Sequence, residues 1–278
     1  MRTLVYIELQ KIFKKWRTYI GFIAIGVMAP LVQLALYFEG DNYLNFATRS
    51  FSDAFLISGN LMNGYLVGNL ILSTLFIHIP FLIVLVGGDL MAGEATSGTF
   101  RLLITRPVSR FQLVNAKFIS GIIYTISLLF FLMVMSLGLG LLIFGSGELI
   151  SLRDKIYIFA SDDVLWRFFA AYGFSIISMT TVMALSFMFS AIVENAIGPI
   201  VGAMAVIIIF MILSVLNIDF LQTLTPYYFT TYMPSWQSFF ADPVDYSEVL
   251  KSGVILIGYI ALFYAVALSL FLKKDILS

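Results

Sequence analysis

The chain has 278 residues, of which 60% are hydrophobic and 12% are charged, with a formal net charge of zero and no cysteine. A soluble domain carries about twice that share of charged residues, so a lipid bilayer is the solvent that fits this composition. The absence of cysteine excludes disulfides, thiolate metal sites and a cysteine nucleophile. Zero net charge gives the chain no overall attraction to nucleic acid.

Six segments are apolar and long enough to cross about 30 Å of hydrocarbon. Their hydrophobicity is continuous rather than alternating, which favours helices over barrel strands. We therefore expect an all-α integral membrane protein with six transmembrane helices, built as a single transmembrane domain over residues 1–278. The predicted spans are Tyr19–Phe38, Leu61–Val86, Phe118–Phe144, Phe168–Val193, Pro199–Leu216 and Val254–Leu272.

The basic residues between these spans are unevenly divided. The N-terminus, the Gly88–Lys117 connection and the C-terminus together hold 11 of the 16 Lys and Arg residues, and the segments on the other side hold five. Connections rich in Lys and Arg stay in the cytosol. The sequence thus predicts cytosolic N- and C-termini.

Residues 1–18 have the pattern of an amphipathic helix lying in the membrane interface. Either this helix only anchors the chain to the membrane surface, or it also supports a cytosolic partner. Its apolar face is predicted to hold Val5, Leu9, Ile12, Phe13 and Trp16, and its polar face Glu8, Lys11, Lys14 and Lys15.

On the outer side, the Asn217–Lys251 connection is rich in aromatic residues, with Pro226, Pro234 and Pro243 as breaks. Amphipathic aromatic side chains favour the headgroup level of a bilayer. We expect short helices on the outer leaflet, anchored by these aromatics, with a substrate exit gate as the alternative.

The cytosolic segment 88–117 is longer than a turn between two spans requires. Thr99 is placed to cap a short helix that runs to Ile104, and Pro107 ends it. Ser109 and Gln112 form a capping-box pattern at the start of the third span. A short cytosolic helix with apolar and basic residues suits a groove on another protein, although a surface helix that only follows the charge rule has the same pattern.

Several ordered features of this segment resemble the membrane subunit of type-2 ATP-binding-cassette exporters. They are Gly93-Glu94, Gly98-Thr99, Leu102-Leu103, Arg106-Pro107-Val108-Ser109-Arg110 and Lys117. The resemblance implies a bacterial cytoplasmic-membrane permease that works as a homo- or heterodimer, each copy docked on a separate cytosolic ATPase. It also implies that ATP and Mg bind to that partner, and that the interface with the ATPase holds Gly93, Glu94, Gly98, Thr99, Arg101, Leu102, Leu103, Arg106, Pro107 and Arg110.

The chain lacks a G-x-x-x-x-G-K-[ST] phosphate loop and an H-E-x-x-H zinc motif. It therefore cannot bind a nucleotide by the first mechanism or hydrolyse a peptide by the second. Aspartate is also absent from the span interiors. We expect a non-catalytic membrane subunit without a cofactor or metal of its own.

Polar residues inside spans are costly, so Asn60, Asn63 and His78 are candidates for a substrate path. Hydrogen bonding between helices is the alternative role for the asparagines, and packing with a hydrogen bond is the alternative for the histidine. Two other functions fit the same composition: an ATP-independent channel or secondary carrier, and a membrane scaffold that recruits a cytosolic protein. A carrier typically has an intramembrane ion pair or broken helices near the bilayer midplane. The sequence shows neither feature, although Pro80 could break one helix.

Overall fold

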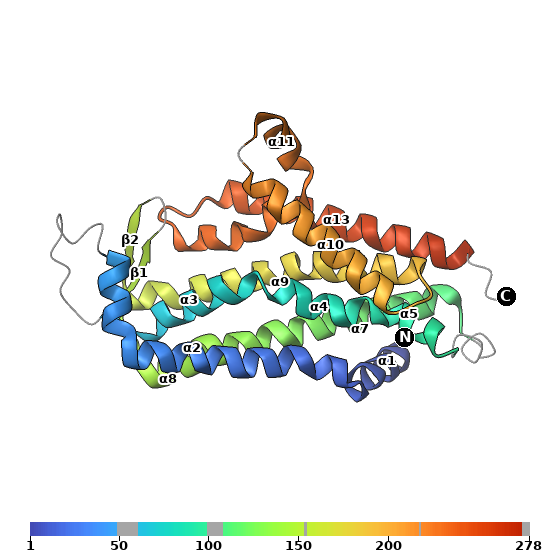
Figure 1. Ribbon diagram of the computed structural model, residues 1–278, viewed down its shortest axis with the longest axis horizontal. Helices are drawn as coiled ribbons and strands as arrows, with labels where there is room; N and C mark the ends of the chain where they lie inside the picture. The colour runs from blue at the N-terminus through green and yellow to red at the C-terminus, as the bar shows by residue number, and fades with distance from the viewer. Residues whose placement is uncertain (49–60, 99–107, 153–154, 217, 274–278) are drawn as a thin grey trace.

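The computed structural model describes residues 1–48, 61–98, 108–152, 155–216 and 218–273. Long helices run along the long axis of the molecule, and α1, α5 and the end of α13 lie at one end, opposite strands β1 and β2 (Figure 1). The elements of the N-terminal half are α1 (Arg2–Lys14), α2 (Trp16–Thr48), α3 (Gly64–Phe76), α4 (Ile79–Gly87), α5 (Asp89–Thr96), α7 (Arg110–Met133), the π-helix η1 (Val134–Gly138) and α8 (Leu139–Phe144).

The C-terminal half begins with these two strands and then becomes helical again, with η2 and η3 as 3₁₀ helices. Its elements are β1 (Leu149–Leu152), β2 (Ile156–Phe159), α9 (Ser161–Ile192), α10 (Ile197–Val215), α11 (Asp219–Leu224), η2 (Thr225–Tyr227), α12 (Phe229–Tyr232), η3 (Met233–Phe240) and α13 (Tyr246–Lys273).

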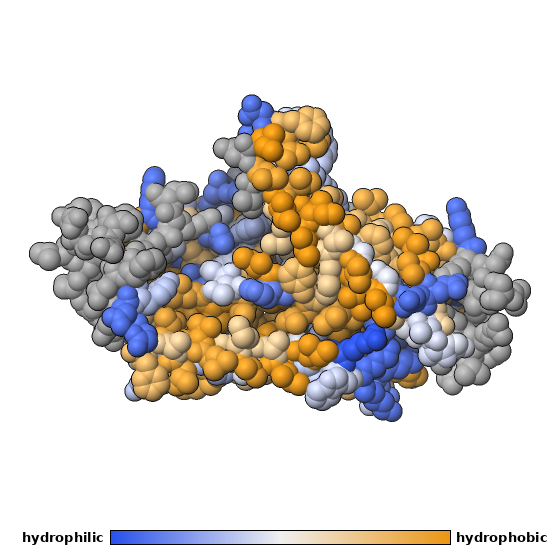
Figure 2. Space-filling model, in the orientation of Figure 1, coloured by the Kyte–Doolittle hydropathy of each residue, from blue (hydrophilic) through white to orange (hydrophobic). Residues whose placement is uncertain are grey.

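Several of these helices confirm the prediction of a mainly helical chain with segments able to span a membrane. Among the described residues, five helices are long and apolar enough to cross a membrane, and the bent pair α3 and α4 is a sixth if it counts as one span. Apolar side chains also cover most of the surface in Figure 2, while hydrophilic residues gather near the end where α1 lies. The five are Trp16–Gly40, Arg110–Phe144, Ser161–Ile192, Ile197–Ser214 and Tyr246–Lys273.

The second predicted span is not one continuous helix. α3 and α4 meet at an angle of 51°. Pro80 lies in the first turn of α4, where a missing N–H costs nothing, but its ring disfavours helical continuation from the preceding residues. His78 lies at the bend, and its Nδ1 is 3.0 Å from the carbonyl oxygen of Thr74.

The third span begins as predicted, with a capping box. The Ser109 hydroxyl accepts a hydrogen bond from the Gln112 backbone N–H at 3.2 Å, and the Ser109 N–H donates to the Gln112 side chain at 3.3 Å. The helix then runs without interruption through α7, η1 and α8.

The central element of the bundle is α9, which packs against α4, α7, α10, α13 and η3. Small hydroxyl residues line it and bind backbone carbonyls, both within the helix and on its neighbours. Ser178 donates to Met233 at 3.1 Å, and Ser190 donates to Gly88 at 2.6 Å. In lipid, the hydrophobic effect does not drive helices together, so their association depends on the close packing that small side chains allow.

Two parts of the chain between the long helices differ from the sequence predictions. β1 and β2 pair in antiparallel fashion, so the all-α prediction is wrong for Leu149–Leu152 and Ile156–Phe159. The aromatic connection does form short helices, but Phe229, Trp236 and Phe240 are at most 2% exposed. They pack against α9, α10 and α13 instead of anchoring at headgroup level, because large apolar rings fill the gap between these helices.

Gly64 lies against the backbone of α8. A Cβ atom at this position would lie 2.6 Å from the backbone of Leu141. We therefore predict that Gly64→Ala lowers the free energy of unfolding by about 1–3 kcal/mol, measured by thermal unfolding in detergent. Gly173→Ala is the control, because no atom lies within 4 Å of a Cβ there; equal effects of the two variants would contradict this assignment.

Candidate functional site

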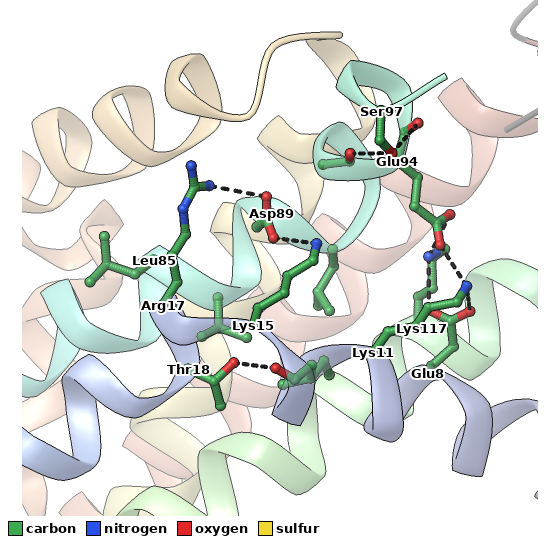
Figure 3. Close-up of a pocket in the computed structure, with 14 residues that line it drawn as sticks. Glu8, Lys11, Lys15, Arg17, Thr18, Leu85, Asp89, Glu94, Ser97 and Lys117 are labelled. Carbon is green, nitrogen blue, oxygen red and sulfur yellow. Dashed lines mark hydrogen bonds and ion pairs between the residues drawn. The ribbon is translucent and has the colours of Figure 1, made fainter. Parts of the chain in front are cut away.

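Four charged side chains meet where α1, α5 and α7 converge. Glu8 and Lys11 come from α1, Glu94 from α5 and Lys117 from α7. We call these four residues the charge cluster (Figure 3). Residues 8 and 11 share a face of α1 because they are three positions apart.

The cluster is a closed arrangement of alternating charge. Lys117 contacts Glu8 at 2.9 Å and Glu94 at 2.7 Å. Lys11 contacts the same two carboxylates at 2.6 and 2.7 Å. The Lys117 side chain is only 1% exposed, and those of Glu8 and Glu94 are 6% and 9% exposed. Each buried charge therefore has two partners of opposite sign, which is the condition under which buried ions are tolerated.

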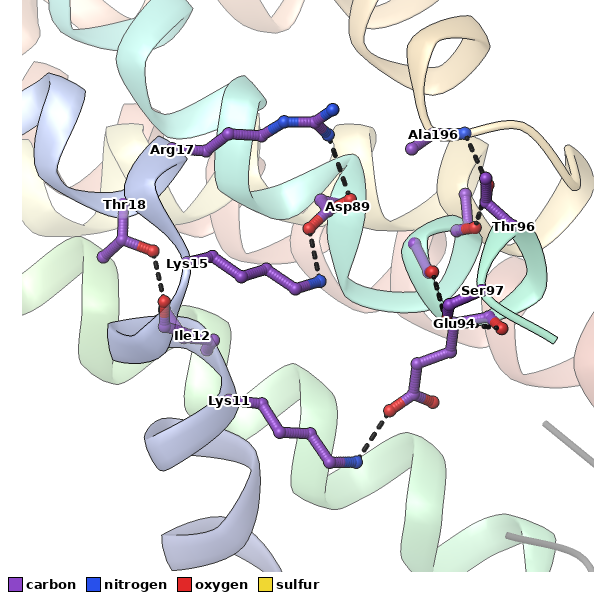
Figure 4. A network of polar contacts seen from close by, with 12 residues as sticks. Lys11, Ile12, Lys15, Arg17, Thr18, Asp89, Glu94, Thr96, Ser97 and Ala196 are labelled. Atoms are coloured by element: carbon purple, nitrogen blue, oxygen red, sulfur yellow. Dashed lines mark hydrogen bonds and ion pairs between the residues drawn. The ribbon is translucent and has the colours of Figure 1, made fainter. Parts of the chain in front are cut away.

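A second ionic contact lies beside the cluster, at the start of α2. Asp89 accepts hydrogen bonds from Lys15 at 2.6 Å and from Arg17 at 3.2 Å (Figure 4). The Thr18 hydroxyl donates a hydrogen bond to the Ile12 carbonyl at 2.5 Å and thereby links α2 to α1 across the break between these helices. Both ends of α5 are thus tied to the N-terminal segment.

The short helix α5 is held by neighbours rather than by its own cap. Its N-cap residue, Gly88, has no side chain, and the N–H groups of Met91 and Ala92 donate instead to the Ser190 hydroxyl of α9 at 3.0 and 2.9 Å. At its other end, the Thr96 hydroxyl donates to the Glu194 carbonyl at 3.0 Å. This helix therefore connects the charge cluster to the central helix.

Gly93 is the position of α5 that must stay small. A Cβ atom there would overlap the Asp89 carboxylate. Any larger residue would push this carboxylate away from Lys15 and Arg17.

A cavity of about 330 Å³ opens beside these charges and is also lined by Leu85, Leu90 and Ser97. Among the residues that the structure describes, we find no group of three or more His, Asp or Glu side chains suited to a metal ion. The cavity therefore combines apolar walls with fixed, paired charges.

Burial and charge act in opposite directions on the pKa values of the cluster. Burial raises the pKa of the Glu8 carboxyl, but the Lys117 ammonium and hydrogen bonds from Lys11 and Lys117 outweigh it, so the pKa lies below its ordinary value of 4.5. Burial lowers the pKa of Lys11, but hydrogen bonds to Glu8 and Glu94 outweigh it and hold the pKa above 10.5. Both groups stay charged near neutral pH.

The structure places part of the predicted ATPase interface. Gly93 and Glu94 lie on α5, and Glu94 is turned inward to the charge cluster. Gly98 follows with a φ of 67°, a value that favours glycine. Arg110 donates to the Leu272 carbonyl of α13 at 3.1 Å. The other predicted interface residues lie outside the described residues: Thr99, Arg101, Leu102, Leu103, Arg106 and Pro107.

The predicted substrate-path residues are not brought together. Asn63 is the N-cap of α3: its Oδ1 accepts from the N–H groups of Tyr65 and Leu66, and its Nδ2 donates to the Glu148 carbonyl at 2.7 Å. His78 is exposed at the bend between α3 and α4. Asn60 lies outside the described residues.

Sequence reasoning missed the partnership between Glu8 and Lys117. Glu8 was expected on the exposed polar face of α1, yet it is buried, and Trp16 of the expected apolar face is 73% exposed. The reason is that α1 packs against α7, where Lys117 compensates the carboxylate. A lysine at the edge of an apolar span was the available signal, since such a residue requires a partner.

A family model described as "Protein of unknown function (DUF2705)" matches residues 23–277. The chain belongs to the DUF2705 family. A segment of this DUF2705 chain is 29% identical over 119 residues to the "Uncharacterized protein YhcI" of Bacillus subtilis (strain 168). That match covers 41% of this chain and 37% of the Bacillus protein, so it spans well under two thirds of the relative's length.

The buried lysine gives the first prediction for this site of the DUF2705 protein. Lys117→Met should lower the free energy of unfolding by about 3–5 kcal/mol, because it leaves the two carboxylates sharing only Lys11. Adding Glu94→Gln should restore part of that loss, as measured by thermal unfolding in detergent. Lys251→Met, at an exposed lysine of α13, is the control and should change stability by less than about 0.5 kcal/mol. If the losses in free energy of unfolding from Lys117→Met and Glu94→Gln simply add in the double variant, the coupling between these two residues is contradicted.

The pKa directions give a second prediction. Because the native pKa of Glu8 is lowered from 4.5, its stabilisation is complete above that pH and is lost as the pH falls through the native pKa. The stabilisation from Lys11 is complete below pH 10.5 and is lost as the pH rises through its raised pKa. The stability difference between wild type and Glu8→Gln should therefore stay constant between these limits and shrink on the acid side. A difference that grows on acidification would contradict the ion pairing.

Proposed function

We propose that this chain is the permease subunit of an ATP-binding-cassette exporter, driven by a separate cytosolic ATPase through segment 88–117. The observation that carries the proposal is the charge cluster, which fastens α5, the helix at the start of that segment, to α1 and α7. The order of motifs in segment 88–117 adds the resemblance to type-2 exporters.

The geometry supplies a route for mechanical coupling. A pull on segment 99–107 acts first on α5, which directly precedes it. From α5, the ion pairs of Glu94 carry the movement to α1 and α7, and the Ser190 hydroxyl carries it to α9. Because α9 packs against most of the other long helices, a displacement of α5 reaches the whole bundle.

In this proposal the chain itself is non-catalytic, and ATP and Mg bind to the partner ATPase. Two permease copies and two ATPases form the working unit in a bacterial cytoplasmic membrane. The termini and α5 are cytosolic, in agreement with the excess of Lys and Arg in those segments.

An ATP-independent channel or secondary carrier is the second candidate, and one observation favours it. The 51° bend between α3 and α4 is the kind of broken span on which carriers build ion sites. His78 is the titratable residue at that bend. A carrier of this kind would lose activity on His78→Gln and would need no ATPase. A scaffold that recruits a cytosolic protein is a third candidate, and it would bind a partner without stimulating hydrolysis.

Co-purification tests the permease proposal. Tagged chain, expressed in its native host and purified in detergent, should bring down an ATPase with a phosphate loop. The variant Arg101→Glu/Arg106→Glu should no longer bind that ATPase, because the two substitutions reverse the charge of the predicted docking helix. Glu94→Gln should retain the ATPase but lower transport-coupled hydrolysis about tenfold, since the link from α5 to α1 and α7 is weakened.

Glu248→Gln is the matched control, because Glu248 is an exposed carboxylate at the start of α13. It should behave as wild type in both assays. Purification of the folded chain without an ATPase, with unchanged behaviour of the Arg101/Arg106 variant, would overturn the proposal and favour the channel or carrier.

A further inference from the structure

A groove runs along the surface where α2 lies against α8. Its volume is about 590 Å³, and its walls include Val27, Leu31, Leu34, Leu139 and Ile143. Gly26 and Pro30 leave it hollow, because neither carries a long side chain. Leu31 and Leu34 are 54% and 55% exposed, so the groove opens sideways, toward lipid. We call it the α2–α8 groove.

Two side chains with polar atoms, Tyr37 and Gln33, line this otherwise apolar groove, and Gln33 is the buried one. Gln33 is 1% exposed, and its amide nitrogen donates to the carbonyls of Met135 and Ser136 at 2.8 and 3.2 Å. Both carbonyls belong to the π-helix η1, where the regular helical hydrogen-bond pattern changes. Gln33 thus binds two backbone acceptors in the neighbouring span.

The orientation of the Gln33 amide follows from these contacts. If the amide were flipped, its oxygen would face two carbonyl oxygens, which is repulsive. The nitrogen must therefore face η1, and Oε1 has no hydrogen-bond partner among the described residues. A buried acceptor in apolar surroundings is costly until a donor reaches it.

We propose that the α2–α8 groove binds a membrane-dissolved amphiphile that donates one hydrogen bond, through a hydroxyl or amide N–H, to Gln33 Oε1. The apolar walls bury the hydrocarbon part. In the part of the chain that the structure describes, no charged residue lines the groove, which disfavours an ionic headgroup. The ligand enters from the bilayer. The proposal does not depend on whether the chain transports anything, because it rests on the groove and on Gln33 alone.

Photolabelling in lipid vesicles tests this site. The probes are a long-chain primary alcohol with a mid-chain diazirine and the alkane of the same length with the diazirine at the same carbon. Mass spectrometry measures labelling of peptides that contain residues 27–37 and 139–143. The alcohol should label these peptides about fivefold more than the alkane, the ratio expected for one net hydrogen bond.

Three variants make the test specific. Gln33→Leu should remove the preference for the alcohol, and Leu31→Trp, which fills the groove while keeping Gln33, should reduce labelling by both probes. Leu142→Trp is the control, because Leu142 lies on α8, is 82% exposed and does not line the groove. Equal labelling by the two probes in wild type, or an alcohol preference that survives Gln33→Leu, would overturn the proposal.

Discussion

The burial of Lys117 is the constraint on which the architecture around α1, α5 and α7 depends. An ammonium that is 1% exposed at the end of an apolar helix is tolerated only if carboxylates surround it. Glu8 and Glu94 meet this requirement from two other helices. Because two carboxylates carry one more charge than Lys117 can neutralise, Lys11 supplies the second positive charge. Because none of these ions is stable alone, α1, α5 and α7 must assemble together, and α1 is held against the bundle.

The hydroxyl residues of α9 extend this arrangement into the membrane. In lipid, backbone groups at helix ends require partners from the protein itself. Ser190 supplies one by accepting from the first N–H groups of α5 while donating to Gly88. The ionic contacts and this serine therefore act on the same short helix from opposite sides, so that α5 moves only if both sides respond.

Much of this fold could be predicted from local sequence, and much of the site could not. Continuous hydrophobicity identified the spans, and Ser109 with Gln112 identified the start of the third. The contact between Glu8 and Lys117 joins residues 109 positions apart, so no local pattern contains it. Composition favoured a surface position for Trp236 because tryptophan is amphipathic, but packing among α9, η3 and α13 buried it.

The irregular points of the second and third spans show how polar residues are used inside this bundle. The bend after α3 frees backbone groups, and His78 approaches the Thr74 carbonyl there. The π-helix frees others, and Gln33 binds the carbonyls of Met135 and Ser136. In both places a polar side chain contacts a backbone carbonyl at the irregular point of a helix, and satisfied backbone groups are the condition for an irregular helix in lipid. His78 and Asn63 are therefore accounted for by structural roles, whereas the unpartnered oxygen of Gln33 and the charge cluster are not fully explained by the fold alone. Function is best sought at those two places.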